Sequence, residues 1–501
     1  MRIKFKSRII KELIPLIIVI IVALFIFPVK GVPVNNNAAN WLQAASKPLH
    51  RLGPEVISNN ILALPLYPII LSSAFKLGGK TVQSASLATR IFFALEIILI
   101  YLLGRIFYGI AVGLLSSGLV LTSYGVNLVA CFIQTDIVLP FFILLFILIY
   151  YITLTRSSRI WAIFAGISLG LALMVKESAL LCLGLPFGMV FLAPKGKRWK
   201  YAQLGFWVIG TLVILLVLGV IYMAFTSDYF NSTLDLARFF YQTSQVTAEI
   251  SSFAQWGYLF TTGFPKTIFN YYHNYLQNVT PLSLLMIFGW FFVLIRAFIS
   301  KKTSDLILAI LGICFLPLIL WTTDVVHRLG QTAMIYIFLY VPLATFVVSS
   351  TSLLIRYAIK FNNKYKKFNT ISSVVKKHPR LISNLLIVLI GFFLIKAQLF
   401  NKNDSTWKFW TEHSYSLSIF AKKKFEVYGR YTNEQQEAAV WLKKNASKNA
   451  KIIADGYTRQ ALDFFEVARY EIPAFHPKKA VSIENFSGKR DDNAQPLYLI
   501  T

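Results

Sequence analysis

Charged residues within or beside apolar stretches are the candidates for chemistry in this sequence. Asp136 precedes one apolar run, Lys176 and Glu177 interrupt another, and His327 and Arg328 stand between two more. An ionised side chain within a membrane span costs about 2.5–3.5 kcal/mol at the helix centre, so each one needs a partner or a task. Lys and Arg bind phosphate oxygens, whereas a carboxylate accepts a proton or holds a metal ion. These residue types therefore predict a site for an anionic lipid headgroup, although charges at helix ends also snorkel to water without any such role.

The apolar stretches determine the class of protein. Of the 501 residues, 56% are hydrophobic and only 14% are charged, whereas about a quarter of a soluble domain is charged. The sequence predicts an all-α polytopic membrane protein with about eleven transmembrane helices. The predicted spans are 13–27, 88–104, 110–130, 137–154, 160–175, 178–193, 202–225, 281–298, 304–321, 332–354 and 382–399.

The net charge is +28, and many of the basic residues lie in the loops between these spans. The N-terminal segment and every second loop together hold 23 of the 50 Lys and Arg residues, and basic residues are retained on the cytoplasmic side. The basicity therefore indicates membrane topology, and nucleic acid is not an expected partner. The chain is expected in the plasma or inner cell membrane, with its N-terminus cytoplasmic and its C-terminus outside. This topology places Asp136, Lys176, Glu177, His327 and Arg328 at the outer ends of their spans.

Two domains are predicted, a transmembrane domain at 1–399 and an extracytoplasmic α/β domain at 400–501. The first has two long outer loops, 30–87 and 226–280, whose aromatic and apolar residues suit helices lying in the membrane interface. In the second, a capping box at Thr432 opens a helix through Lys444, a strand followed by a turn is expected at 451–456, and a further strand is expected at 497–500.

Several motifs, in order along the chain, resemble those of membrane glycosyltransferases of the GT-C fold that use polyprenyl-phosphate sugars. This group includes the protein O-mannosyltransferases and the aminoarabinose transferases of lipid A, glycosyltransferase family 39-like enzymes. Each motif is weak by itself, and the resemblance depends on their order and membrane side. The matching segments are Pro65–Ile70, Arg90 with Leu103–Gly109, Gln134–Asp136, Gly166–Glu177, and His327–Arg328 followed by Tyr340–Leu343.

The resemblance implies the GT-C fold and transfer of a sugar, with inversion, from a polyprenyl-phosphate carrier to a protein, lipid or glycan acceptor at the outer face. The proton of the acceptor must then go to a carboxylate, for which Asp136 is the first candidate and Glu55 the second, unless the acceptor is already anionic. One departure concerns the acid that the family carries in the first outer loop. The matching stretch, Val34–Trp41, holds only Asn as polar residue, and Asn cannot accept a proton. The residues expected to bind the lipid phosphate and the sugar are Lys176, Glu177, His327, Arg328, Asn36 and Asn37.

Three classes of function are compatible with these features. The first is the enzyme just described, with the lipid-linked sugar as donor, no resident cofactor assigned, and a divalent cation allowed but without an identified ligand set. The second is an inactive relative that acts as a binding subunit, which the missing acid of the first loop favours. The third is a transporter, which would show two homologous halves and helices broken at the midplane.

Overall fold

A computed structural model gives the fold of most of the predicted transmembrane region. The structure describes residues 14–22, 41–42, 45, 66–130, 133–226, 281–321, 329–365, 378–400, 444, 451–454 and 497–500. All statements below concern these residues.

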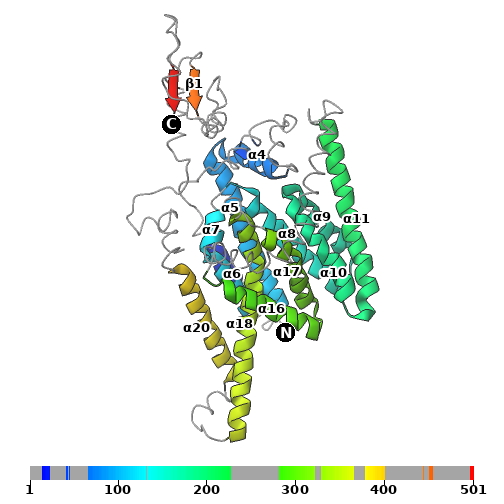
Figure 1. The fold of residues 1–501 in the computed structure, drawn as a ribbon, viewed down its shortest axis with the longest axis vertical. Helices are drawn as coiled ribbons and strands as arrows, with labels where there is room; N and C mark the ends of the chain where they lie inside the picture. The colour runs from blue at the N-terminus through cyan, green and yellow to red at the C-terminus, as the bar shows by residue number, and fades with distance from the viewer. Residues whose placement is uncertain are drawn as a thin grey trace, which may run out of the picture.

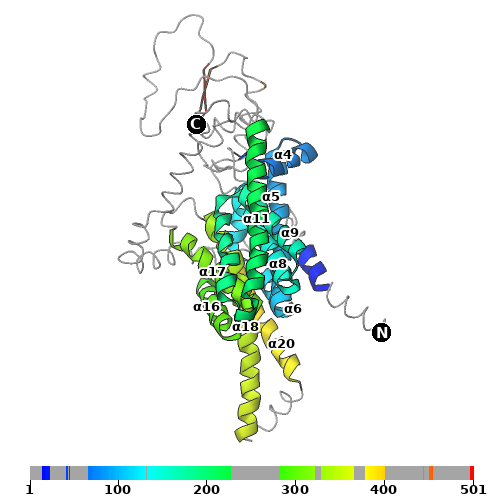
Figure 2. The ribbon, with the colours of Figure 1, turned by 90° about the vertical axis from the view of Figure 1, so that its right-hand side faces the viewer.

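Helices form one elongated bundle, and a helix at one end lies across it (Figures 1 and 2). The transverse helix is α4, in the first predicted outer loop, where an interfacial helix was expected. The helices are α4 (Leu66–Gly78), α5 (Val82–Tyr108), α6 (Ile110–Leu121), α7 (Tyr124–Ala130), α8 (Thr135–Arg156), α9 (Arg159–Val175), the 3-10 helix η2 (Glu177–Leu183), α10 (Gly184–Leu192), α11 (Lys195–Thr226), α16 (Ser283–Ser300), α17 (Thr303–Trp321), α18 (Leu329–Tyr365) and α20 (Pro379–Leu399).

The described helices coincide with the predicted spans from the second to the last, so the chain is an integral membrane protein built mainly of α-helices. Six helical segments are long and apolar enough to cross a membrane, namely α5, α8, Lys195–Val217 of α11, α16, Phe338–Phe361 of α18, and α20. Five further apolar helices are shorter. The total of eleven transmembrane helices stays a prediction.

Two of the predicted continuous spans are broken in the structure. The span 110–130 becomes α6 and α7, because the Asn127 side chain donates to the carbonyls of Leu121 and Ser123 at 2.7 Å and so holds a turn between the helices. The span 178–193 begins as η2 and continues as α10. Pro186 has no N–H to donate to the carbonyl of Cys182, four residues earlier, which weakens a regular α-helix at this point.

The bundle is held together by close helix contacts and an apolar core. Among the six candidate spans, α8 and α18 are the most buried and α20 the least, so α8 lies inside the bundle while α20 lies at its margin. Glycines permit the closest approaches. A Cβ atom on Gly104 would lie 2.8 Å from the Cα atom of Gly113, so α5 and α6 could not pack this closely with larger residues. Gly109, with φ of 105°, makes the reversal between these two helices.

Two short strands, β1 (Lys451–Ala454) and β2 (Leu497–Ile500), lie where strands were expected. They pair in parallel, with Lys451 opposite Leu497. A parallel pair requires a long crossover connection, which the 42 intervening residues supply. The extent of the predicted α/β domain at 400–501, and the boundary at 399, stay predictions.

Gly289 provides a test of the α16–α18 contact. A Cβ atom there would lie 2.6 Å from the Cα atom of Leu343 and 2.7 Å from its backbone nitrogen. Because backbone atoms cannot move aside cheaply, we expect Gly289→Ala to lower the free energy of unfolding in detergent micelles by about 1–3 kcal/mol. Gly210→Ala is the matched control, since no atom lies within 4 Å of a Cβ there. Equal stability of the two variants would contradict this packing.

Candidate functional site

Asp136 and Lys176 form an ion pair at the end of the bundle where α4 lies. Nζ of Lys176 is 2.6 Å from Oδ1 of Asp136, and the two side chains are 17% and 10% exposed. Asp136 lies in the first turn of α8, where the helix dipole favours a negative charge. Lys176 follows the last residue of α9 in an extended conformation, with φ of −161° and ψ of 141°. The hairpin of α8 and α9 thus brings together two charges 40 residues apart.

A tyrosine of α4 connects this pair to the first predicted outer loop. The hydroxyl of Tyr67 is 3.3 Å from Oγ1 of Thr89 on α5, and its side chain is fully buried. Burial raises the pKa of Tyr67, the negative charge of Asp136 raises it further, and the hydrogen bond with Thr89 lowers it. Tyr67 therefore remains a neutral phenol beside the ion pair. Its ring also packs edge-on against Trp41, with centroids 5.2 Å apart.

The structure places only some of the residues predicted for the site. It brings Asp136 and Lys176 together, and it shows Glu177 as the first residue of η2, directly after Lys176. The remaining predicted site residues are Glu55, Asn36, Asn37, His327 and Arg328, and all five lie outside the described residues. Trp41 is the described residue nearest in sequence to the asparagine stretch, and its ring packs against that of Tyr67. The catalytic and binding roles of all these residues stay predictions.

Tyr67 and Thr89 are site residues that the sequence did not single out. Both types are common in packed helices and carry no net charge, so charge patterning gave no signal for them. Tyr67 does fall within the proline-containing motif Pro65–Ile70, which is the one feature that could have directed attention to it.

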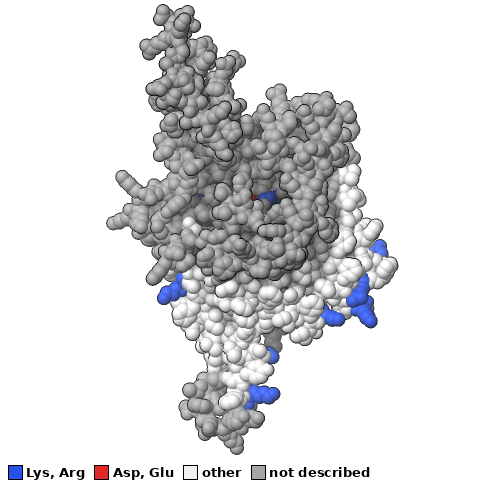
Figure 3. Space-filling view, in the orientation of Figure 1, with Lys and Arg blue, Asp and Glu red and all other residues white. Residues whose placement is uncertain are grey.

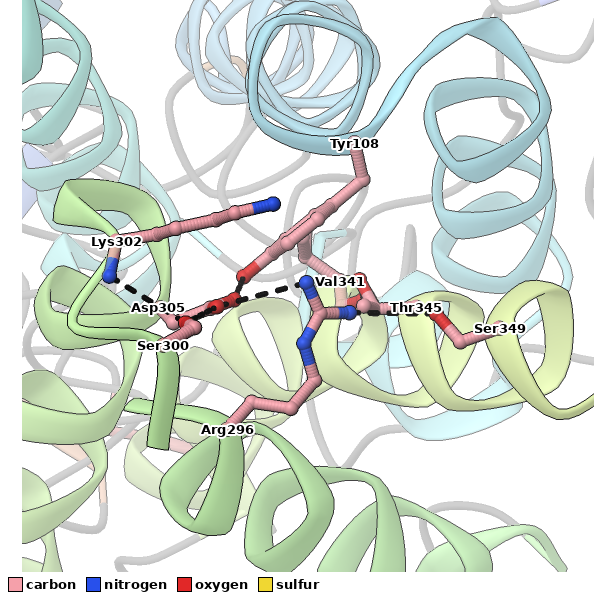
Figure 4. A network of polar contacts seen from close by, with 8 residues as sticks. All are labelled: Tyr108, Arg296, Ser300, Lys302, Asp305, Val341, Thr345 and Ser349. Carbon is pink, nitrogen blue, oxygen red and sulfur yellow. Dashed lines mark hydrogen bonds and ion pairs between the residues drawn. The ribbon is translucent and has the colours of Figure 1, made fainter. Parts of the chain in front are cut away.

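A second polar cluster, also missed in the sequence, lies at the opposite end of the bundle (Figure 4). The buried carboxylate of Asp305 accepts hydrogen bonds from Tyr108 Oη at 2.6 Å and Ser300 Oγ at 2.9 Å, and it pairs with Arg296 at 3.4 Å. Arg296 also donates to Ser349 Oγ at 3.3 Å. The cluster ties together α5, α16, α17 and α18, and its buried carboxylate is matched by the guanidinium of Arg296. It is best explained as a structural clamp.

No metal site can be assigned from the described part of the chain. No group of three or more His, Cys, Asp or Glu side chains with the geometry to hold a metal ion occurs there. In the described part of this site, the carboxylate of Asp136 is paired with the ammonium group of Lys176.

Comparison with known proteins supports the family resemblance. Residues 63–223 match the sequence model of the dolichyl-phosphate-mannose-protein mannosyltransferase family. This segment contains Tyr67, Asp136, Lys176 and Glu177. No protein of curated function matches the chain.

Solved structures with a similar fold include those of AglB and ArnT. The archaeal oligosaccharyltransferase AglB from Archaeoglobus fulgidus, in complex with an inhibitory peptide and a dolichol-phosphate, is 12% identical with a TM-score of 0.54, and the match covers 91% of this chain. ArnT from Cupriavidus metallidurans in the apo state is also 12% identical, with a TM-score of 0.51, and the match covers 93% of this chain and 86% of ArnT. The chain spans 63% of the length of AglB. These matches confirm the GT-C fold and the resemblance to glycosyltransferases that use lipid-phosphate carriers.

The ion pair can be tested by a double-mutant cycle on stability. Removing one partner leaves the other largely buried without this ion pair, so Asp136→Asn and Lys176→Met should each destabilise the protein by about 1–3 kcal/mol. The double variant should lose less than the sum of the two, with a coupling of about 0.5–3 kcal/mol. Lys396→Met, at an exposed lysine of α20, serves as control and should leave stability unchanged. Additive losses in the cycle would show that the two side chains do not interact in the folded protein.

Proposed function

We propose that the chain, which resembles GT-C glycosyltransferases, is an integral membrane glycosyltransferase. It moves a sugar from a polyprenyl-phosphate carrier to an acceptor at the outer membrane face. The acceptor is a protein, a lipid or a glycan. The N-terminus is cytoplasmic, and the 400–501 segment lies outside, where it helps to hold the acceptor.

The observation that carries this proposal is the ion pair of Lys176 with Asp136. Nζ of Lys176, which can bind a phosphate, lies 2.6 Å from Oδ1 of Asp136, which can accept a proton. The pair lies at the end of the bundle where α4 of the first predicted outer loop lies. Both residues fall within the segment that matches the mannosyltransferase family. Among the solved proteins of this fold, AglB was captured with a dolichol-phosphate, which has the chemistry proposed for the carrier here.

In the proposed reaction, the acceptor hydroxyl attacks the anomeric carbon of the donor sugar from the face opposite the phosphate. A bond forms between the acceptor oxygen and this carbon, and the bond from the carbon to the phosphate oxygen breaks, so the anomeric configuration inverts. The electron pair leaves with the lipid phosphate, which Lys176 and Arg328 hold. Preorganised cations stabilise this growing charge most strongly where water is scarce. Asp136 takes the proton of the acceptor, with Glu55 as the second candidate.

Because of the ion pair, donor binding should precede proton transfer to Asp136 in the proposed reaction. While Lys176 holds Oδ1 of Asp136, that oxygen is not available to the acceptor hydroxyl. The donor is a phosphodiester with one negative charge, as the carboxylate has, and it competes for the same ammonium group; the phosphate gains a second negative charge as it leaves the sugar. We infer that donor binding draws Lys176 toward the phosphate and frees Asp136 for the proton. The carboxylate then becomes an effective base only when the donor is in place.

The second candidate function, a binding subunit without transferase activity, is favoured by one observation. The stretch that should carry the family's first-loop acid contains asparagines, and Trp41 at its end packs on Tyr67 beside the ion pair. An asparagine there binds a sugar hydroxyl but accepts no proton. In that case the protein would hold the lipid-linked sugar without consuming it.

Transfer from radiolabelled polyprenyl-phosphate sugars by the purified full chain tests the proposal. Wild type should consume at least one donor, whereas Asp136→Asn should reduce the rate of transfer about 10²–10⁴-fold because proton removal is lost. Lys176→Ala should lower kcat/KM about 10²–10³-fold through loss of phosphate stabilisation. Lys396→Ala should match wild type. Donor that binds to wild type but is never consumed would support the binding-subunit function instead.

Binding of the unreactive carrier phosphate separates the two roles. Asp136→Asn should bind polyprenyl phosphate as tightly as wild type or more tightly, because Lys176 no longer has a competing carboxylate. Lys176→Ala should bind it at least tenfold more weakly. Isothermal titration in micelles measures both values. Weaker binding by Asp136→Asn would contradict the exchange of Lys176 between the two anions.

A further inference from the structure

Two neighbouring turns at the end of the bundle opposite Asp136 carry a dense group of exposed cations, which we call the basic patch. The turns join α8 to α9 and α10 to α11. Helices α9 and α11 pack side by side, since a Cβ atom on Gly166 would lie 2.6 Å from the carbonyl oxygen of Val208. Figure 3 shows Lys and Arg side chains at this end, over the lower part of α11. The patch consists of Arg156, Arg159, Lys195, Lys197, Arg198 and Lys200.

The cations of the patch have no acidic partner in the described part of the protein. None of the six forms an ion pair with another described residue. Arg296, at the same end of the bundle, differs because it pairs with the buried Asp305. The patch is therefore a local excess of positive charge that the fold does not neutralise with the residues described.

Two helices of the patch begin with basic residues, although acidic residues are usually preferred at the start of a helix. Arg159 is the first residue of α9, and Lys195, Lys197 and Arg198 lie in the first turn of α11. Neither helix has an acidic residue in its first turn, and Ser158 does not cap α9 with its side chain. The start of a helix carries partial positive charge, so these cations repel it. An external anion would relieve this repulsion.

Tryptophan rings set the depth of the patch in the membrane. The guanidinium of Arg156 lies 5.9 Å from the ring centroid of Trp161, and that of Arg159 lies 5.9 Å from the ring centroid of Trp207. Trp199, within the patch, is 76% exposed. Tryptophan is enriched at the level of lipid headgroups, where its ring faces both acyl chains and water. Arginines beside these rings are thus held at the depth of the lipid phosphates.

We propose that the basic patch binds the phosphates of anionic phospholipids in the leaflet opposite the Asp136–Lys176 pair. By the distribution of basic residues this is the cytoplasmic leaflet, whose anionic lipids attract basic segments. The exposed cations contact lipid phosphates, while the indole rings pack beside the upper acyl chains. This inference is independent of the proposed transfer reaction, because none of the patch residues lies at the Asp136–Lys176 site.

Quenching of tryptophan fluorescence by brominated lipids tests the proposal on the full chain in micelles. Brominated phosphatidylglycerol should quench at lower lipid fractions than brominated phosphatidylcholine. A variant with Arg156→Gln, Arg159→Gln, Lys195→Gln and Lys197→Gln should bind phosphatidylglycerol about tenfold more weakly, or weaker still. Arg198 is kept, because its Nε donates to the carbonyl of Ala193 at 3.1 Å and so supports the turn.

The matched control removes four exposed cations from the same end of the bundle but outside the patch, with Lys301→Gln, Lys302→Gln, Arg356→Gln and Lys360→Gln. It should bind phosphatidylglycerol within about twofold of wild type. Far-UV circular dichroism should show wild-type helicity for both variants. An equal loss of phosphatidylglycerol binding in the control would overturn the proposal, and so would equal quenching of wild type by the two lipids. Displacement of phosphatidylglycerol by millimolar inorganic phosphate would also overturn it, because it would indicate a site for a soluble anion.

Discussion

The attraction between one ammonium group and one carboxylate, at the edge of an apolar bundle, is the interaction on which the proposed chemistry depends. Lys176 and Asp136 are only 17% and 10% exposed, so neither charge is well solvated and each is stabilised by the other. Electrostatic interactions are stronger in such surroundings than in water. A third charge that enters the site, such as a lipid phosphate, therefore changes the energies of both residues. In the proposed reaction, donor binding and proton transfer are linked through a single lysine.

The two ends of the bundle use buried charge in different ways. At the end where α17 begins, Asp305 is fully buried and receives two hydroxyl hydrogen bonds as well as a guanidinium, so it has little capacity left for a ligand. At the end where α8 begins, Asp136 pairs with Lys176 and remains partly accessible. A saturated network rigidifies the helices it connects, whereas an accessible ion pair can exchange partners. The clamp around Asp305 thus supplies a fixed frame for the proposed site, in which Lys176 is proposed to change partners.

The helical breaks show how local sequence chemistry positions the Asp136–Lys176 pair. The lysine that interrupts the apolar stretch adopts an extended conformation, and a proline ten residues later weakens regular α-helix in the segment that follows. The result is that Lys176 leaves the helix axis and turns its side chain to the start of α8. A continuous helix through this position would have carried the ammonium group on a helical face instead. The interruption was visible in the sequence, but the 3-10 geometry of η2 was not.

Composition and the positions of apolar runs determined by themselves that this is a polytopic helical membrane protein and which residues belong to most helices, and they predict which loops share a side. These are local properties, since each helix must satisfy its own backbone in lipid and each loop carries its own charge. The sequence also singled out Asp136 and Lys176, because charges near apolar runs are rare. Only the tertiary structure decided that they pair, that Tyr67 lies beside them, and that Tyr108 bonds to Asp305 across 197 positions. Such contacts depend on how helices pack, and the side chains that settle packing lie far apart in the chain.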